Sequence, residues 1–171
     1  NPYDEMVEDD IGFPVKMAQQ SYQYLQERVA EQTQELKRLS YEDSLTGLYN
    51  RNKFNQDLNI EQGPNQFGIG VACFDLNGLK EVNDRNGHRA GDVLICRAAE
   101  CLKKGFEGKA YRIGGDEFVV IDNTLAEDDF KAAVYAVQKT MEHDGISCSV
   151  GISWRNSQYN IREQIDEADR F

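Results

Sequence analysis

The stretch YRIGGDEFVV, residues 111–120, places two adjacent carboxylates, Asp116 and Glu117, between two short apolar runs. Gly114 and Gly115 stand directly before them, and glycines let a backbone turn tightly and let a large ligand approach. Another carboxylate, Asp75, stands next to last in FGIGVACFDL, the most hydrophobic run of strand length in the chain. A carboxylate in such a place is costly unless it is exposed, paired or bound to a cation.

The chemistry open to these carboxylates depends on whether the strand end and the glycine turn are neighbours in a sheet. If they are, the unpaired carboxylates repel one another and a pKa rises. A hard divalent cation with oxygen ligands resolves the repulsion, and Mg²⁺ bridging substrate phosphates is the usual case. The alternative is a solvated acidic turn and an unrelated strand-end aspartate, and spacing alone does not separate the two.

Composition and charge argue against several classes of binding partner. The 171 residues are enough for one domain with a core and an appendage. The formal net charge of -11 argues against nucleic acid and anionic membranes as partners, so a phosphate-bearing substrate needs local positive charge or a metal ion. The cysteines form no CxxC pair and the histidines lie far apart, which argues against zinc and suits a reducing cytoplasm. No apolar run reaches membrane-spanning length, so we expect a cytoplasmic location without direct membrane contact by this chain, whether or not a parent protein is membrane-anchored.

The elements that would position the carboxylates mix helices and strands. We expect helices over 51–58, 92–104, 128–143 and 160–171, a short helix with loops over 77–92, and strands over 67–76 and 145–154. The runs KAYRI and EFVVI, joined through Gly114 and Gly115, predict a hairpin. This mixed order predicts an α+β fold, with helices packed on one or both faces of a sheet.

The N-terminal part has a different pattern. Residues 1–14 are acidic, contain two prolines and a glycine, and are interpreted as a linker, whereas residues 15–40 are interpreted as a helical stalk. That helix is either an amphipathic helix lying on the domain or a parallel two-stranded coiled coil, and we favour the coiled coil although about three heptads is near the lower limit. The positions of its seam are Ala18, Tyr22, Leu25, Val29, Gln32, Leu36 and Leu39.

Several motifs in the order found here resemble the GGDEF domain family, the diguanylate cyclases. RIGGDEF is similar to the family signature, DSLTGLYNR to its opening segment, FDLNGLKEVNDRNGHRAGDVL to its metal- and base-binding region, and SCSVGISW to its last core strand. A lone GGDEF is a weak signal, but the combination argues against a chance match. We therefore interpret residues 41–171 as a GGDEF catalytic domain, truncated within its C-terminal helix.

The resemblance implies a fold and an activity. The fold is a central, mostly antiparallel sheet with surrounding helices, similar to the palm of adenylyl cyclases and polymerases. The activity is condensation of two GTP molecules into cyclic di-GMP with release of pyrophosphate, as the output domain of a bacterial signalling protein. Each domain holds one GTP, so the resemblance also implies that a homodimer is needed for catalysis.

The resemblance also assigns roles to the carboxylates of the hydrophobic run and of the glycine turn. It implies Mg²⁺ or Mn²⁺, two ions in each active site, and a catalytic role for Asp75, Asp116 and Glu117. The implied metal ligands are Asp75, the backbone carbonyl of Leu76, Asp116 and Glu117.

Substrate contacts are implied elsewhere. Asn83 and Asp92 match the pair that contacts guanine, since Asn pairs with a guanine edge and Asp accepts from N1–H and N2–H₂. Lys80 matches a phosphate-contacting lysine, and Arg112 is either a substrate contact or a structural ion-pair partner. Gly114 and Gly115 are interpreted as clearance for the nucleotide.

The sequence departs from the family pattern at several places, and the segment from Asp92 to Gly114 is also short. Asn77 replaces a second aspartate that is not the principal metal ligand, so we expect activity to survive. Gly105 and Gly108 occupy the positions of the inhibitory RxxD motif, so we expect no such site. The family's C-terminal helix continues beyond ADRF to a Lys and an Arg that are not in this sequence. The alternative function is a weak or inactive module that acts as a GTP or cyclic di-GMP receptor, and the intact signature acids favour the cyclase.

Overall fold

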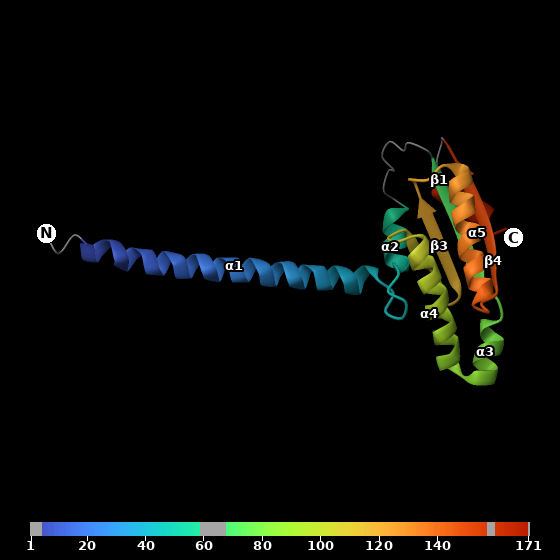
Figure 1. Ribbon diagram of the computed structural model, residues 1–171, viewed down its shortest axis with the longest axis horizontal. Helices are drawn as coiled ribbons and strands as arrows, with labels where there is room; N and C mark the ends of the chain where they lie inside the picture. The colour runs from blue at the N-terminus through green and yellow to red at the C-terminus, as the bar shows by residue number, and fades with distance from the viewer. Residues whose placement is uncertain (1–4, 59–67, 157–159, 171) are drawn as a thin grey trace. The chain divides into compact units, whose positions relative to one another are not determined.

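A computed structural model of the chain describes residues 5–58, 68–156 and 160–170. Contacts divide the chain after Leu39, into a first unit that contains most of the long helix α1 and a second unit that begins at Ser40. The second unit contains the strands and the shorter helices (Figure 1).

Helix α1 runs over Glu5–Tyr41, so it begins ten residues before the predicted helix. Residues 5–14, which the sequence predicts as a linker, are therefore helical, and residues 1–4 lie outside the described ranges. Pro14 lies inside the helix. A proline removes one backbone hydrogen bond, which kinks or weakens a helix locally, but the remaining turns on both sides keep their own bonds. The predicted seam is exposed along α1, with Tyr22 and Leu36 each 66% exposed.

An antiparallel sheet forms the centre of the second unit. Its strands are β1 (Ile69–Leu76), β2 (Ala110–Arg112), β3 (Glu117–Asp122) and β4 (Cys148–Arg155). Their order is β2-β3-β1-β4, and every neighbouring pair is antiparallel. These strands confirm the predicted α+β fold with a mostly antiparallel sheet, and they place the most hydrophobic run, β1, in the interior.

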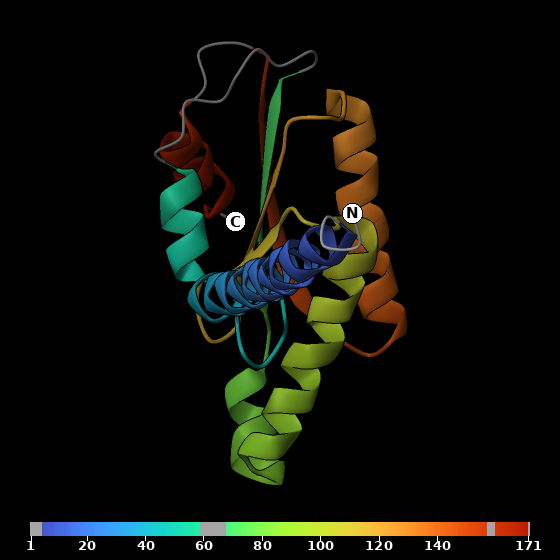
Figure 2. The ribbon, with the colours of Figure 1, turned by 90° about the vertical axis from the view of Figure 1, so that its left-hand side faces the viewer.

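Helices cover both faces of the sheet. They are α2 (Arg51–Asp57), α3 (Leu79–Asn86), α4 (His88–Gly105), α5 (Glu127–His143) and α6 (Ile161–Ala168). Figure 2 shows α4 and α5 on one side of the strands and α2 and α6 on the other. Because side chains alternate along a strand, Phe74 of β1 packs in the core under α4 and α5, whereas Val71 and Cys73 pack with α2 and α6. Burial on both faces explains why β1 reads as a continuous apolar run.

The polar stretch after β1 is more helical than predicted. Gly78 (φ +76°) and Gly87 (φ +82°) lie in the left-handed region and bound α3 on its two sides. Helix α4 then begins at His88, four residues before the predicted start at Asp92. The result is a helix pair, α3 and α4, that follows directly from the end of the central strand.

Candidate active site

The end of β1 and the glycine turn of the β2–β3 hairpin are neighbours in the sheet. Asp75 is the register partner of Glu117 across the β1–β3 pair. One residue further, the amide of Leu76 donates a hydrogen bond of 3.1 Å to the carbonyl of Asp116. The antiparallel pairing therefore brings together the carboxylates that lie 41 residues apart in the sequence, Asp75 and Asp116.

Negatively charged side chains lie close together in this site. Burial raises the pKa of Asp75, and the charges of Asp116 and then Asp169 raise it further. Asp169 caps the C-terminal end of α6, and sequence reasoning did not single it out. Its approach depends on how α6 packs back onto the sheet, which no local pattern in the sequence reports. The pKa of the nearby Cys73 thiol is also raised, to about 12, by burial and by the charges of Asp169 and Glu117.

The protein atoms alone do not enclose a cation. Within residues 5–58, 68–156 and 160–170, no group of three or more His, Cys, Asp or Glu side chains is arranged to hold a metal ion. The donors at the strand end are hard carboxylate oxygens, and the charge of Asp116 adds to the effect of burial on Asp75. This donor set suits Mg²⁺, which keeps waters and substrate phosphates among its ligands instead of using an all-protein cage.

The two glycines of the turn have different surroundings. A Cβ atom on Gly114 would lie 2.3 Å from Oε2 of Glu117, so this glycine makes room for the Glu117 carboxylate. A Cβ atom on Gly115 would meet nothing within 4 Å. The backbone closes the turn with a 3.0 Å hydrogen bond from the amide of Ile113 to the carbonyl of Glu117. The space beside Gly114 is therefore filled by the side chain of Glu117, whereas the space beside Gly115 is open.

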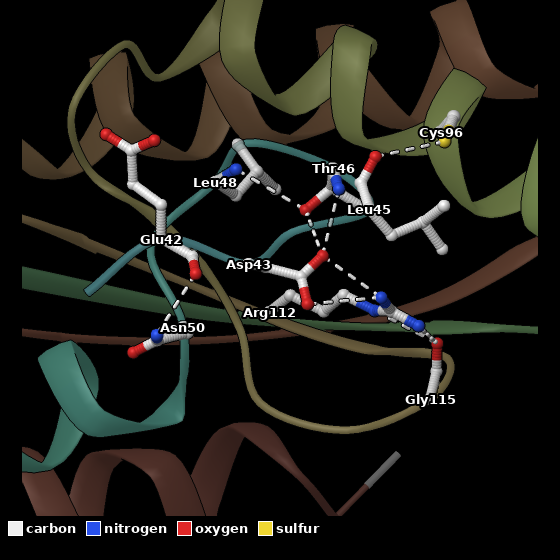
Figure 3. A network of polar contacts seen from close by, with 9 residues as sticks. All are labelled: Glu42, Asp43, Leu45, Thr46, Leu48, Asn50, Cys96, Arg112 and Gly115. Atoms are coloured by element: carbon white, nitrogen blue, oxygen red, sulfur yellow. Dashed lines mark hydrogen bonds and ion pairs between the residues drawn. The ribbon is translucent and has the colours of Figure 1, made fainter. Parts of the chain in front are cut away.

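Arg112 holds this turn in place (Figure 3). Its Nη2 donates to the carbonyl of Gly115 at 2.9 Å, and its Nη1 lies 3.0 Å from Oδ1 and 3.3 Å from Oδ2 of Asp43. The Asp43 carboxylate also accepts hydrogen bonds from the amide and the hydroxyl of Thr46, at 2.9 and 2.7 Å. These contacts are those of a structural ion pair, which was one of the two roles considered for Arg112.

Further bonds attach the loop between α1 and α2 to the hairpin. The amide of Arg112 donates to the carbonyl of Tyr49 at 2.7 Å, and the amide of Tyr49 donates to the carbonyl of Ala110 at 3.3 Å. In the same loop, Nδ2 of Asn50 donates to the carbonyl of Glu42 at 3.1 Å (Figure 3). The segment DSLTGLYNR thus supports the outer strand β2 and the turn beyond it.

The residues expected to contact the base and phosphates lie on the α3–α4 pair. Lys80 is exposed in the first turn of α3, and Asp92 is exposed near the start of α4. Asn83 is half-buried on α3, and its Oδ1 is buried without a hydrogen-bond partner in the described part of the chain. Because α3 begins three residues after β1 ends, these side chains lie at the same end of the sheet as Asp75.

The chain is similar in sequence to known proteins. Residues 40–171 match the family model described as diguanylate cyclase, GGDEF domain. The chain is 29% identical over 151 residues to diguanylate cyclase DgcS of Shewanella oneidensis, covering 82% of this chain and 51% of that protein. It is 33% identical over 152 residues to the bifunctional diguanylate cyclase/cyclic di-GMP phosphodiesterase MucR of Pseudomonas aeruginosa, covering 80% of this chain and 22% of MucR. The chain thus spans about half the length of DgcS and less of MucR.

A solved structure supports the fold. The coiled coil and GGDEF domain of DgcB from Caulobacter crescentus, in complex with cyclic di-GMP, superimposes with a TM-score of 0.74. The alignment covers 92% of this chain and 90% of that one, at 23% sequence identity. None of the helices in the described ranges is both long and apolar enough to cross a membrane. The family model covers the whole sheet and its covering helices, so this chain belongs to the GGDEF domain family.

Proposed function

We propose that this chain is a diguanylate cyclase domain of a bacterial signalling protein, which condenses two GTP molecules into cyclic di-GMP and pyrophosphate. The observation that carries the proposal is the register of Asp75 against Glu117, with Asp116 adjacent through its backbone bond to Leu76. Mg²⁺ that bridges substrate phosphates binds to carboxylate oxygens, and here one carboxylate lies at a strand end and another in a tight glycine turn beside it.

Four groups would hold the metal ions: the carboxylates of Asp75, Asp116 and Glu117, and the backbone carbonyl of Leu76. Mg²⁺ or Mn²⁺, two ions in each site, would neutralise the triphosphate and polarise its α-phosphate. Burial and then the charge of Asp116 raise the pKa of Asp75, and a bound cation would relieve that repulsion, which supports this assignment.

Positioning carries most of the remaining catalysis. Asn83 and Asp92 bind the guanine edge, and Lys80 binds phosphate oxygens. In each half-reaction the 3′-oxygen of one GTP bonds to the α-phosphorus of the other, the bond to the β-phosphate oxygen breaks, and pyrophosphate leaves. Glu117 contributes either a metal ligand or the acceptor of the 3′-hydroxyl proton. Two such steps, in opposite directions, close the ring.

Because each domain holds one GTP, two domains must face each other, and we propose that α1 brings them together as a homodimer. Its support is the row of exposed apolar side chains at a/d spacing, including Leu25 (59% exposed) and Val29 (60%). An isolated helix with such a row exposed to water gains by pairing with a second copy.

The proposal is tested by incubating the purified chain with GTP and Mg²⁺ and measuring cyclic di-GMP by mass spectrometry, with Asp116→Asn as the control. Product from the wild type and none from the variant is the expected result. The alternative is a receptor that binds GTP or cyclic di-GMP without turnover. Tight GTP binding by the wild type with no cyclic product would favour the receptor and contradict the cyclase.

A further inference from the structure

The α3–α4 pair contains one contact that only a glycine permits. Gly91 is buried in the first turn of α4 and faces Asn83 of α3. A Cβ atom on Gly91 would stand 2.0 Å from Oδ1 and 2.9 Å from Cγ of Asn83. Any side chain at position 91 would therefore displace the Asn83 amide from its present place.

The same contact orients the amide group. Oδ1 of Asn83 is buried against Gly91 and has no hydrogen-bond donor among the described residues. Rotating the amide by 180° would bury Nδ2 there instead, leaving two N–H donors without an acceptor in place of one unpaired oxygen. A carbonyl oxygen against an α-carbon hydrogen is the better arrangement. Gly91 therefore keeps the oxygen inward and makes Nδ2 the end of the amide that is offered to a ligand.

We propose that Gly91 is a positioning residue, which fixes the Asn83 amide so that Nδ2 donates to O6 of guanine. The inference rests on the proposed function, since it concerns the base of the same substrate. Guanine presents the O6 acceptor at the position where adenine presents the N6 donor, so a fixed N–H donor selects guanine. Asp92, the residue after Gly91, then accepts from N1–H and N2–H₂.

Substitution of Gly91 separates this role from a structural one. In Gly91→Ala the nearest obstacle is the end of a flexible side chain, so Asn83 moves away and the fold is kept. Alanine is also the better helix former, which favours folding of the variant. A matched control exists in the same helix: a Cβ atom on Gly105 would lie 2.3 Å from Cγ2 of Val137 on α5, away from Asn83.

The experiment measures base recognition without turnover. Nucleoside diphosphates carry the base but cannot release pyrophosphate, so GDP, IDP and 2-aminopurine riboside diphosphate are titrated with Mg²⁺ by calorimetry. GDP and IDP both have O6, whereas 2-aminopurine lacks it. We expect Gly91→Ala to raise the Kd for GDP and IDP about tenfold each, the value of one hydrogen bond, and to leave the Kd for the 2-aminopurine compound unchanged. Gly105→Ala should leave all three dissociation constants unchanged.

Asn83→Ala supplies an independent variant. It should raise the Kd for GDP by the same factor as Gly91→Ala. The double variant should raise this Kd no further, because both substitutions act on one contact. An unchanged Kd for GDP in Gly91→Ala, or an equal weakening of all three nucleotides, would overturn the inference alone. A wild type that binds GDP no better than ADP would overturn the proposed function and this inference with it.

Discussion

Arg112 and Asp43 form an ion pair across 69 positions of the sequence, with Nη1 of Arg112 lying 3.0 and 3.3 Å from the two carboxylate oxygens. Their side chains are only 14% and 22% exposed. The guanidinium also donates to Gly115, the residue before Asp116. The pair therefore connects the loop that follows α1 to the turn that carries the signature carboxylates.

Replacing Asp43 with alanine should destabilise the fold and slow catalysis. The variant leaves the shielded guanidinium of Arg112 without its carboxylate partner, which costs about 2–3 kcal/mol of unfolding free energy. Because the turn before Asp116 then loses an anchor, kcat should fall more than KM rises. Urea unfolding and initial-rate kinetics measure the two effects.

Its control is Glu35→Ala, which breaks the Arg38–Glu35 pair on α1, where both side chains are more than half exposed. Exposed pairs of this kind contribute little, so we expect no measurable change in stability or rate. Equal losses in the Asp43 and Glu35 variants would contradict a special role for the Arg112–Asp43 pair.

The buried carboxylate of Asp122 should make stability depend on pH. Burial raises its pKa, but hydrogen bonds from Lys109, from the amides of Thr124 and Leu125 and from the Thr124 hydroxyl outweigh burial, and the net pKa is lowered. Since the folded pKa lies below the unfolded value of about 3.9, this stabilisation is complete above about pH 4 and is lost as pH falls through the folded pKa.

Asp122→Asn should therefore cost about 2–3 kcal/mol near neutral pH, and the difference from wild type should shrink below about pH 4. Urea unfolding of both proteins over this range gives the comparison. A stability difference that stays constant into acid would show that the carboxylate charge of Asp122 contributes nothing.

The cysteines should react in a definite order. Burial, then the charges of Asp169 and Glu117, raise the pKa of Cys73 to about 12, and burial, then Glu142, raises that of Cys148 to about 11. Cys96 is only half-buried. Because the thiolate is the nucleophile, iodoacetamide should modify Cys96 at least about tenfold faster than Cys73 in the folded protein. Peptide mass spectrometry follows each site, and equal rates before the addition of urea would contradict this environment for Cys73.

Removing charge from the strand end should trade activity for stability. Asp75→Asn relieves repulsion by Asp116 and Asp169, so its melting temperature without metal should be higher than that of the wild type. Turnover should fall by at least about 100-fold, because the amide is a poorer partner for a cation. A variant that melts lower and retains activity would contradict the assignment of Asp75.

The seam of α1 should control the oligomeric state. Leu25→Asp places a charge in the apolar row, whereas Gln34→Asp changes a position outside it. Sedimentation should show the first variant as a monomer with turnover reduced at least about tenfold, and the second as a dimer with normal turnover. If Leu25→Asp remained dimeric, the pairing surface would lie elsewhere.

The strands could be predicted because an apolar run of strand length and a glycine hairpin follow local rules, but the spacing of residues left open whether the carboxylates converge. Their convergence follows from the antiparallel pairing of β1 with β3, which places Asp75 beside Glu117. The extent of α1 could not be predicted, because Pro14 is a strong local breaker signal that a long helix overrides.

Contacts between segments that are far apart in the sequence could not be predicted either. No local pattern reports that Asp43 reaches Arg112 or that Asp169 comes close to Asp75. Each depends on how a loop, a helix end or a turn packs against another element, which is a property of the folded chain.

The proposal that Asp75 and Asp116 form a working cyclase site is tested by the stoichiometry of the reaction with GTP and Mg²⁺. We predict two pyrophosphates released for each cyclic di-GMP formed by the wild-type chain, and a rate at least about 100-fold lower for Asp116→Asn. GTP bound by the wild type without any cyclic di-GMP, or an Asp116→Asn variant as fast as the wild type, would contradict it.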